Sequence, residues 1–144
     1  MPNMDLKKSP MPVQDPYARI TNFDEVALGY SYETAVNEAK RCLNCKHRPC
    51  VSGCPVHIQI PDFIQQIVKG DYDAAYEIIA DASNLPAVCG RVCPQENQCE
   101  GSCILGIKGE PVAIGKLERY VGDWKIANSD NAPVEIERNG HKVA

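Results

Sequence analysis

Hydrophobic residues recur every three to four positions in four stretches of the chain, which is the spacing of one face of an α-helix. The first stretch covers Tyr32–Lys40 behind Ser31, a favourable capping residue. The second starts near Pro61 and stops at Gly70, and Asp71 caps the third. The apolar faces consist of Ala35, Val36 and Ala39; Phe63, Ile64, Ile67 and Val68; Ala74, Ala75, Ile78, Ile79 and Ala82; and Ile114, Leu117, Val121 and Trp124.

The two ends of the chain lack this pattern. Residues 1–22 contain four prolines and little periodicity, so we expect an extended N-terminal arm without regular structure. Residues 128–144 are typical of a linker, in which Val134–Ile136 and Lys142–Ala144 are strand candidates around an Asn139–Gly140 turn. Residues 23–127 between them are interpreted as one domain of short helices.

Composition indicates that the core needs support. The 144 residues are 44% hydrophobic but have little aromatic bulk, namely two Phe, six Tyr and one Trp. Such a chain supports one modest core. Eight cysteines and eleven prolines divide it into short pieces, which predicts a stabilising element besides apolar packing.

Charge and targeting signals narrow the function classes. A formal charge of −4 gives no attraction to phosphate backbones or anionic lipid, so neither nucleic acid nor membrane is an expected partner. The N-terminus lacks a signal-peptide core, and nowhere do eighteen apolar residues run together. We therefore expect a cytoplasmic protein, where thiols more often bind metal or react than form structural disulfides.

The eight cysteines fall into two tight groups. The first is Cys42-x2-Cys45-x4-Cys50-x3-Cys54-Pro55, and the second is Cys89-x3-Cys93-Pro94-x4-Cys99-x3-Cys103. Short loops between cysteines can wrap an iron-sulfur cubane, with backbone N–H groups turned toward sulfur. In bacterial ferredoxins the cysteine before proline ligates the other cluster. Cys54-Pro55 matches that feature, so ligands are expected to be exchanged between the groups.

Three other interpretations account for eight cysteines. A disulfide framework matches the even count but not a reducing compartment. Two zinc sites also match the count, although only Cys42 and Cys45 form the C-x2-C pair that zinc sites usually use. Unliganded core thiols conflict with the Gly, Pro and polar residues around them. The zinc interpretation gives the alternative function, a zinc-stabilised interaction module without redox activity.

Five ordered motifs carry a family resemblance. Segments 41–45 (RCLNC), 50–56 (CVSGCPV), 60–63 (IPDF), 85–94 (LPAVCGRVCP) and 111–119 (PVAIGKLER) closely resemble the amino-terminal iron-sulfur domain of the glutamate synthase small subunit. Related domains occur in dihydropyrimidine dehydrogenase and in the large subunit of the bifurcating NADH-dependent ferredoxin:NADP oxidoreductase. The resemblance implies an all-α domain, similar to α-helical ferredoxins, wrapped around two [4Fe-4S] clusters.

The resemblance also implies which residues hold the clusters. One cluster would take Cys42, Cys45, Cys50 and Cys103, and the other would take Cys54, Cys93, Cys99 and Glu118. The position of Glu118 matches a glutamine ligand in dihydropyrimidine dehydrogenase. Cys89 then lies outside both sets. The opposite choice, with Cys89 as ligand and Glu118 as a surface carboxylate, stays open.

The function implied by the resemblance is electron transfer. The parent enzyme would pass electrons between NADPH, FAD and the clusters, and then to a catalytic partner subunit or domain. Residues 1–144 contain no glycine-rich dinucleotide fingerprint and no catalytic constellation. FAD and NADPH are therefore expected in other domains of the parent, and this chain is not a complete enzyme. Basic residues beside the cysteines either offset cluster charge or are ordinary surface charges, namely Arg41, Lys46, Arg48 and Arg91.

Overall fold

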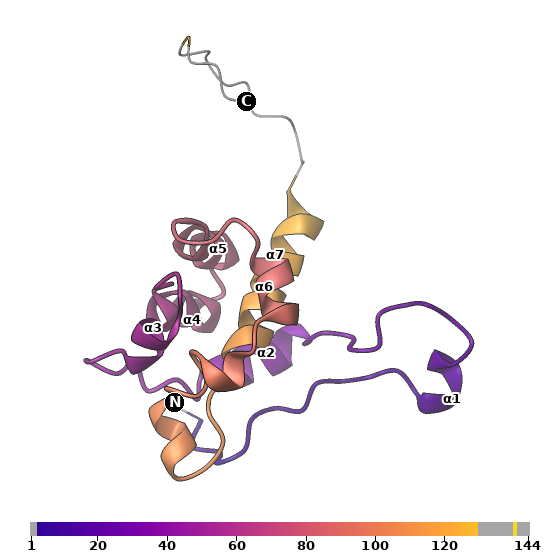
Figure 1. Ribbon diagram of the computed structural model, residues 1–144, viewed down its shortest axis with the longest axis horizontal. Coiled ribbons are helices and arrows are strands. Elements are labelled where there is room, and N and C mark those ends of the chain that lie inside the picture. The colour runs from indigo at the N-terminus through magenta and orange to yellow at the C-terminus, as the bar shows by residue number, and fades with distance from the viewer. Residues whose placement is uncertain (1–2, 130–139, 141–144) are drawn as a thin grey trace.

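The computed structural model describes residues 3–129 and residue 140, and its regular elements in that part are helical (Figure 1). In chain order they are α1 (Pro16–Arg19), α2 (Tyr32–Ala39), α3 (Pro49–Gly53), α4 (Ile60–Lys69), α5 (Tyr72–Ala80), α6 (Pro86–Val92), the short 3-10 helices η1 (Gln95–Asn97) and η2 (Ile104–Ile107), and α7 (Ile114–Asn128). The described part has no strand; the pairing of Val13 with Ala27 is an isolated bridge. The all-α prediction is confirmed.

Local signals explain where the predicted helices begin and end. The Ser31 hydroxyl accepts a hydrogen bond from Thr34 N at the start of α2, and an Asp71 carboxylate oxygen accepts one from Ala74 N at the start of α5. Pro61 occupies the first turn of α4, and Gly70 ends this helix with a left-handed φ of 80°. The predicted helices at these places are confirmed, although α5 ends before Ala82.

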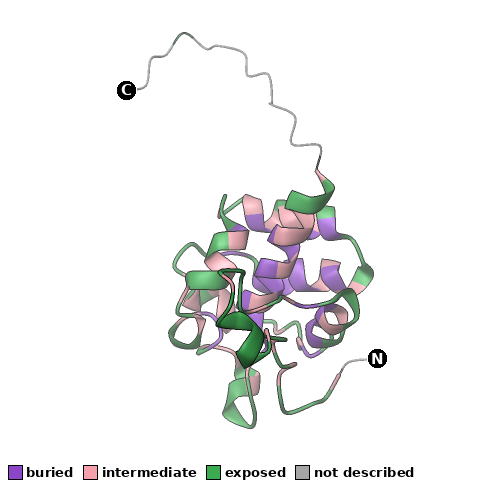
Figure 2. Ribbon diagram, turned by 90° about the vertical axis from the view of Figure 1, so that its right-hand side faces the viewer, coloured by how far each residue is buried: buried purple, intermediate pink, exposed green. Residues whose placement is uncertain are grey.

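The core lies where α2, α4, α5 and α7 meet, and Figure 2 shows the buried residues gathered there with exposed residues around them. Seven residues of the predicted apolar faces of α4, α5 and α7 are completely buried: Phe63, Ile64, Ile67, Ala75, Ile79, Leu117 and Val121. Each large apolar side chain buried in this way contributes about 1.5–3 kcal/mol. The periodic residues thus hold four helices together.

The helices α6 and α7 approach so closely that only small residues fit between them. A Cβ atom at Gly90 would lie 2.5 Å from Arg119 N, and one at Gly122 would lie 2.6 Å from Ala87 N. Any larger side chain at these glycines would force the helices apart. This spacing fixes the end of α6, where Cys93 lies, against the middle of α7, where Glu118 lies.

The N-terminal arm has two different parts. Residues 3–10 lie across the helical body, where Asn3 N donates to Lys40 O and Leu6 O accepts from Glu110 N. The loop that follows projects from the body with α1 at its tip, as Figure 1 shows, and returns to the body where Glu25 pairs with Arg91 and Ala27 O accepts from Arg119. Asp15 caps α1 by accepting a hydrogen bond from Tyr17 N. The expectation of no regular structure in residues 1–22 is therefore wrong at α1.

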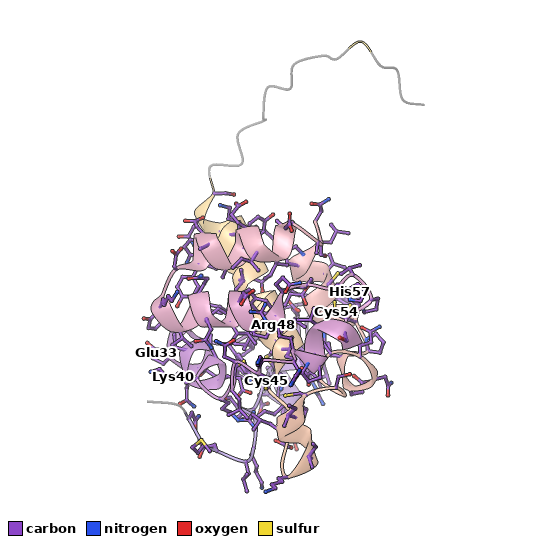
Figure 3. The ribbon with its side chains drawn as sticks, turned by 90° about the vertical axis from the view of Figure 1, so that its left-hand side faces the viewer. Glu33, Lys40, Cys45, Arg48, Cys54 and His57 are labelled. Carbon is purple, nitrogen blue, oxygen red and sulfur yellow. The ribbon has the colours of Figure 1, made fainter. Side chains whose placement is uncertain are left out.

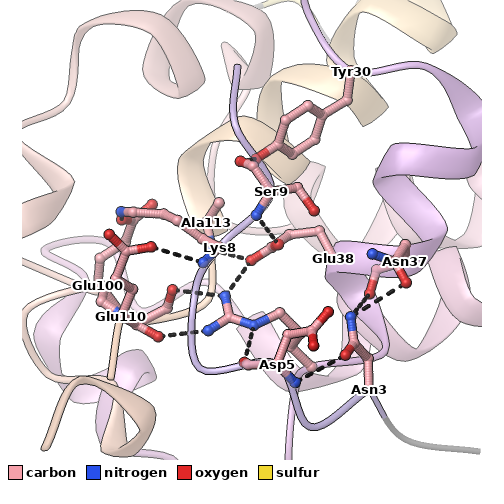
Figure 4. Close-up of polar contacts among 12 residues, drawn as sticks. Asn3, Asp5, Lys8, Ser9, Tyr30, Asn37, Glu38, Glu100, Glu110 and Ala113 are labelled. Carbon is pink, nitrogen blue, oxygen red and sulfur yellow. Dashed lines mark hydrogen bonds and ion pairs between the residues drawn. The ribbon is translucent and has the colours of Figure 1, made fainter. Parts of the chain in front are cut away.

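A buried ion pair joins the arm to the helical body (Figure 4). Glu38 and Arg41 are 0% and 1% exposed, and their charged atoms are 2.7 Å apart. Arg41 also donates to the backbone carbonyls of Asp5, Glu110 and Pro111. Because all three nitrogen atoms of the Arg41 guanidinium donate hydrogen bonds, the charge tolerates burial.

The carboxylate of Glu38 is equally well satisfied. Its Oε2 atom accepts from Ser9 N at 2.6 Å, and its Oε1 atom accepts from Ala113 N at 2.9 Å. Ala113 directly precedes α7, and Arg41 directly precedes Cys42. The pair therefore fixes the start of α7 relative to the first cysteine.

Some elements differ from the sequence-based expectations, and other expected elements lie outside the described residues. The helices α3 and α6 and both 3-10 helices lie within or beside the cysteine groups, where no helix was predicted. The strand candidates Val134–Ile136 and Lys142–Ala144 lie outside the described residues. No helix in the described part of the chain is long and apolar enough to cross a membrane.

Replacing Glu38 with alanine removes the acceptor of three hydrogen bonds and leaves Arg41 as an unpaired buried charge. We expect a loss of about 3–5 kcal/mol in the free energy of unfolding. Urea unfolding of the anaerobic chain, followed by far-ultraviolet circular dichroism, measures the change. The control Asp73→Ala breaks the exposed Lys125–Asp73 pair and should leave the midpoint nearly unchanged. An equally small effect of Glu38→Ala would show that the pair does not stabilise the fold.

Candidate metal centre

Four thiols from both cysteine groups line one apolar cavity. Cys42 follows α2, Cys45 lies in the next loop, Cys50 is in α3, and Cys103 precedes η2. Ile60, Ile64, Leu105, Val112 and Ile114 are among the apolar residues that complete the lining. The cavity thus brings Cys103, from the second group, to three cysteines of the first.

Burial and backbone hydrogen bonds shift the pKa values of the thiols in this cavity in opposite directions. Burial raises the pKa of the Cys50 thiol to about 11, and the nearby Cys42 and Cys103 add to the shift. Burial also raises the pKa of Cys42, against a hydrogen bond from the Asn44 backbone that lowers it. Desolvation outweighs the backbone hydrogen bonds in both cases. A metal that binds here must therefore displace thiol protons.

The backbone of the first cysteine group bends sharply at three residues. Asn44, Arg48 and His57 have positive φ angles of 47°, 44° and 56°, a region that costs side-chain-bearing residues about 1–2 kcal/mol each. Each of these residues lies within three positions of a cysteine along the chain. Figure 3 shows Cys54 beside His57, while Cys45 lies apart from them.

Arg48 is the basic residue that lies close to a thiol of this cavity. Its guanidinium donates two hydrogen bonds to Asp62, at 2.6 and 2.8 Å. The pKa of Arg48 is raised, mainly by Asp62 and to a smaller extent by the charge of Cys50. Of the other basic candidates, Arg41 is fully engaged in the buried pair, and Arg91 pairs with Glu25 and Asp123.

A second set of donors surrounds Cys93, at the end of α6. Burial raises the pKa of Cys93 to about 11, and the neighbouring Cys89, Glu118 and Cys54 raise it further. Burial raises the pKa of Cys99 to about 12, and Cys54 and Glu118 are again among its neighbours. Cys54 from the first group is therefore an electrostatic neighbour of Cys93 and Cys99 in the second.

Glu118 is a buried carboxylate side chain with one oxygen atom that lacks a polar partner among the described residues. It is 7% exposed, and its Oε1 atom is buried without a hydrogen-bond partner among the described residues. Burial raises the pKa of this carboxyl to about 7. A buried carboxylate oxygen with no partner is costly. A metal beside Cys93 and Cys99 would satisfy it, so the donor set fits an iron site. The alternative in which Glu118 is a surface carboxylate does not agree with this burial.

Cys89 lies one helical turn before Cys93 on α6, where it is half buried. Its sulfur is 3.7 Å from the Ser83 hydroxyl oxygen. The structure thus places both proposed alternatives, Cys89 and Glu118, beside Cys93. Within residues 3–129 and 140, no three His, Cys, Asp or Glu side chains are arranged to hold a single metal ion.

A close backbone contact connects the two cysteine groups. A Cβ atom at Gly53 would lie 2.7 Å from Gln98 O and 2.9 Å from Ser102 Cβ. Gly53 directly precedes Cys54, while Gln98 and Ser102 directly precede Cys99 and Cys103. The absence of a side chain at Gly53 therefore lets the two groups meet.

Sequence reasoning missed several residues that stabilise the site without belonging to either set of donors. Glu38, Glu100 and Lys8 were not singled out, yet Glu100 is 5% exposed and pairs with Lys8 at 2.8 Å. The spacing Glu38-x2-Arg41 was an available signal for an ion pair on one helix face. Nothing in the sequence indicated that Ser9 and Ala113 would complete that pair.

Comparison with known proteins supports an iron-sulfur cofactor in this chain. Residues 19–130 match the family described as dihydropyrimidine dehydrogenase domain II, 4Fe-4S cluster. The chain is 38% identical to the glutamate synthase [NADPH] small chain of Escherichia coli K12, over 98% of this chain and 30% of that protein. It is 37% identical to the Azospirillum brasilense small chain, over 78% of this chain and 24% of that protein.

A third relative has a different activity in its name. The chain is 36% identical to the NAD-dependent dihydropyrimidine dehydrogenase subunit PreT of Escherichia coli K12, over 83% of this chain and 28% of that protein. Across the matched relatives, the chain spans from 17% to 30% of their length.

Replacing Gly53 with alanine should push the first cysteine group away from the second. We expect a loss of about 1–3 kcal/mol in the free energy of unfolding, because the added methyl group meets backbone, and less iron bound per chain. The unfolding midpoint and the iron content of anaerobically purified protein are the measurements. Gly106→Ala is the matched control, since its Cβ atom would meet only Pro111 at 3.8 Å. Equal results for both variants would refute this role of Gly53.

Proposed function

The chain belongs to the 4Fe-4S family of dihydropyrimidine dehydrogenase domain II, and from that premise we propose that it is an electron-transfer domain with two [4Fe-4S] clusters. The observation that carries the proposal is the exchange of one cysteine between the groups. Cys103 lines a cavity with three cysteines of the first group, and Cys54 lies with Cys93 and Cys99. Each set therefore combines cysteines from both cysteine groups.

Two ligand sets follow from this arrangement. The first consists of Cys42, Cys45, Cys50 and Cys103, and the second consists of Cys54, Cys93, Cys99 and Glu118. The unpartnered, buried Oε1 atom supports Glu118 as the fourth donor of the second set. Eight donors for two clusters agree with the four iron corners of each.

The protein's own residues contribute placement and electrostatics, while the bound clusters supply one-electron chemistry. The apolar lining around Cys42 and Cys50, with Ile60 and Ile64, keeps water away from the thiols. Backbone N–H groups of Asn44, Val51 and Glu100 donate to Cys42, Cys50 and Cys99. Such hydrogen bonds to sulfur, and the nearby charge of Arg48, raise a cluster's reduction potential.

The place of this domain in an enzyme is inferred from the relatives. Their names describe NADPH-dependent glutamate synthase small chains and an NAD-dependent dehydrogenase subunit. We infer that the domain relays electrons between FAD, reduced by NADPH in domains joined by residues 128–144, and a catalytic partner subunit in the cytoplasm. The described residues supply the relay and its ligands; substrate chemistry belongs to the partner.

Elemental analysis tests the cluster proposal. Protein purified and kept under anaerobic conditions should contain about eight iron and about eight acid-labile sulfide per chain, with a brown colour that fades on reduction. The measurement is inductively coupled plasma spectrometry together with a sulfide assay and a visible spectrum. The matched control is the same chain after chelation and reconstitution with iron and sulfide. Zinc at integral stoichiometry, without sulfide even after reconstitution, would contradict the proposal.

A further inference from the structure

The second site has more donors than a cluster has corners. A cubane cluster offers four iron corners. The donors around Cys93 include Cys54, Cys89 and Glu118, and Cys99 shares Cys54 and Glu118 as neighbours. These are five side chains in all. One of them is therefore in excess when the site is filled.

Cys89 is placed to act on the same region as Cys93. Cys89 lies in α6, and Cys93 is the residue that directly follows this helix, four positions later. Cys93 N donates to Cys89 O at 3.0 Å, which keeps this turn closed.

The two competing donors differ in how they are held. The Oε1 atom of Glu118 is buried and has no partner in the described part of the chain. Cys89 has the Ser83 hydroxyl as a weak partner, at 3.7 Å. The Cys89 thiol therefore has a weak polar partner when it binds no cluster, whereas the Glu118 Oε1 atom has none in the described part of the chain. Soft thiolate sulfur is also a better ligand for iron-sulfur clusters than oxygen.

We propose that Cys89 is a reserve ligand, which binds the iron corner assigned to Glu118 whenever the carboxylate does not. The inference rests on the proposed function, because it requires a cluster at the second site. The exchange moves no electrons. An iron–oxygen bond is replaced by an iron–sulfur bond, and the proton of the Cys89 thiol passes to the released carboxylate or, where that is absent, to water.

Four variants of the full chain test the proposal: Cys89→Ser, Glu118→Ala, Glu118→Leu and the double variant Glu118→Ala/Cys89→Ser. Iron content and the electron paramagnetic resonance spectrum are measured on anaerobic protein. Cys89→Ser should match the unaltered chain. Glu118→Ala and Glu118→Leu should keep about eight iron per chain with a shifted spectrum of one reduced cluster. The double variant should lose about one iron and show a three-iron signal after oxidation.

Different results identify different errors. If Glu118→Ala and the double variant have the same iron content and the same spectrum, Cys89 is not a reserve ligand. If Cys89→Ser alone loses iron, Cys89 is the primary ligand, and the proposal is equally overturned. Glu118→Leu fills the volume that alanine empties, so a folding defect confined to Glu118→Ala is recognised. An unaltered chain with fewer than two clusters would instead refute the proposed function.

Discussion

The buried pair of Glu38 and Arg41 is the interaction on which the placement of the site depends. Arg41 precedes Cys42, and its guanidinium reaches the carbonyls of Glu110 and Pro111. Glu38 accepts a hydrogen bond from Ala113, at the start of α7. Since α7 carries Glu118, this ion pair links Cys42, in the first proposed ligand set, to Glu118, in the second. Its full burial makes this relation rigid, because neither charge has water as an alternative partner.

The two cysteine groups contact each other within the helical body that this ion pair stabilises. Gly53 lets the chain before Cys54 touch the chain before Cys99 and Cys103, and Gly90 lets α6 approach α7 beside Glu118. Burial raises the pKa of four thiols, those of Cys42, Cys50, Cys93 and Cys99. Metal binding must then release protons and satisfy buried donors together, which couples cluster assembly to folding. Iron and apolar packing are thus complementary sources of stability in a chain with a modest core.

Periodic segments were predictable from the sequence, and segments governed by distant contacts were not. The faces of α2, α4, α5 and α7 follow apolar spacing, and Ser31 and Asp71 mark helix starts. The helices α3 and α6 are too short to show a stripe, although Pro49 and Pro86 in their first turns were usable signals. The Cys54-Pro55 motif indicated an exchange of Cys54 between the groups, and this exchange stays a prediction. The burial of Glu118 was not predictable, because it depends on packing between α6 and α7.

The most direct measurement of the central claim is anomalous diffraction at the iron edge, from crystals of the chain grown without oxygen. We expect two separate iron peaks, one among Cys42, Cys45, Cys50 and Cys103, and one among Cys54, Cys93, Cys99 and Glu118. A single peak, or one peak held by the four cysteines of each sequence group without exchange of Cys54 and Cys103, would contradict the interleaved arrangement.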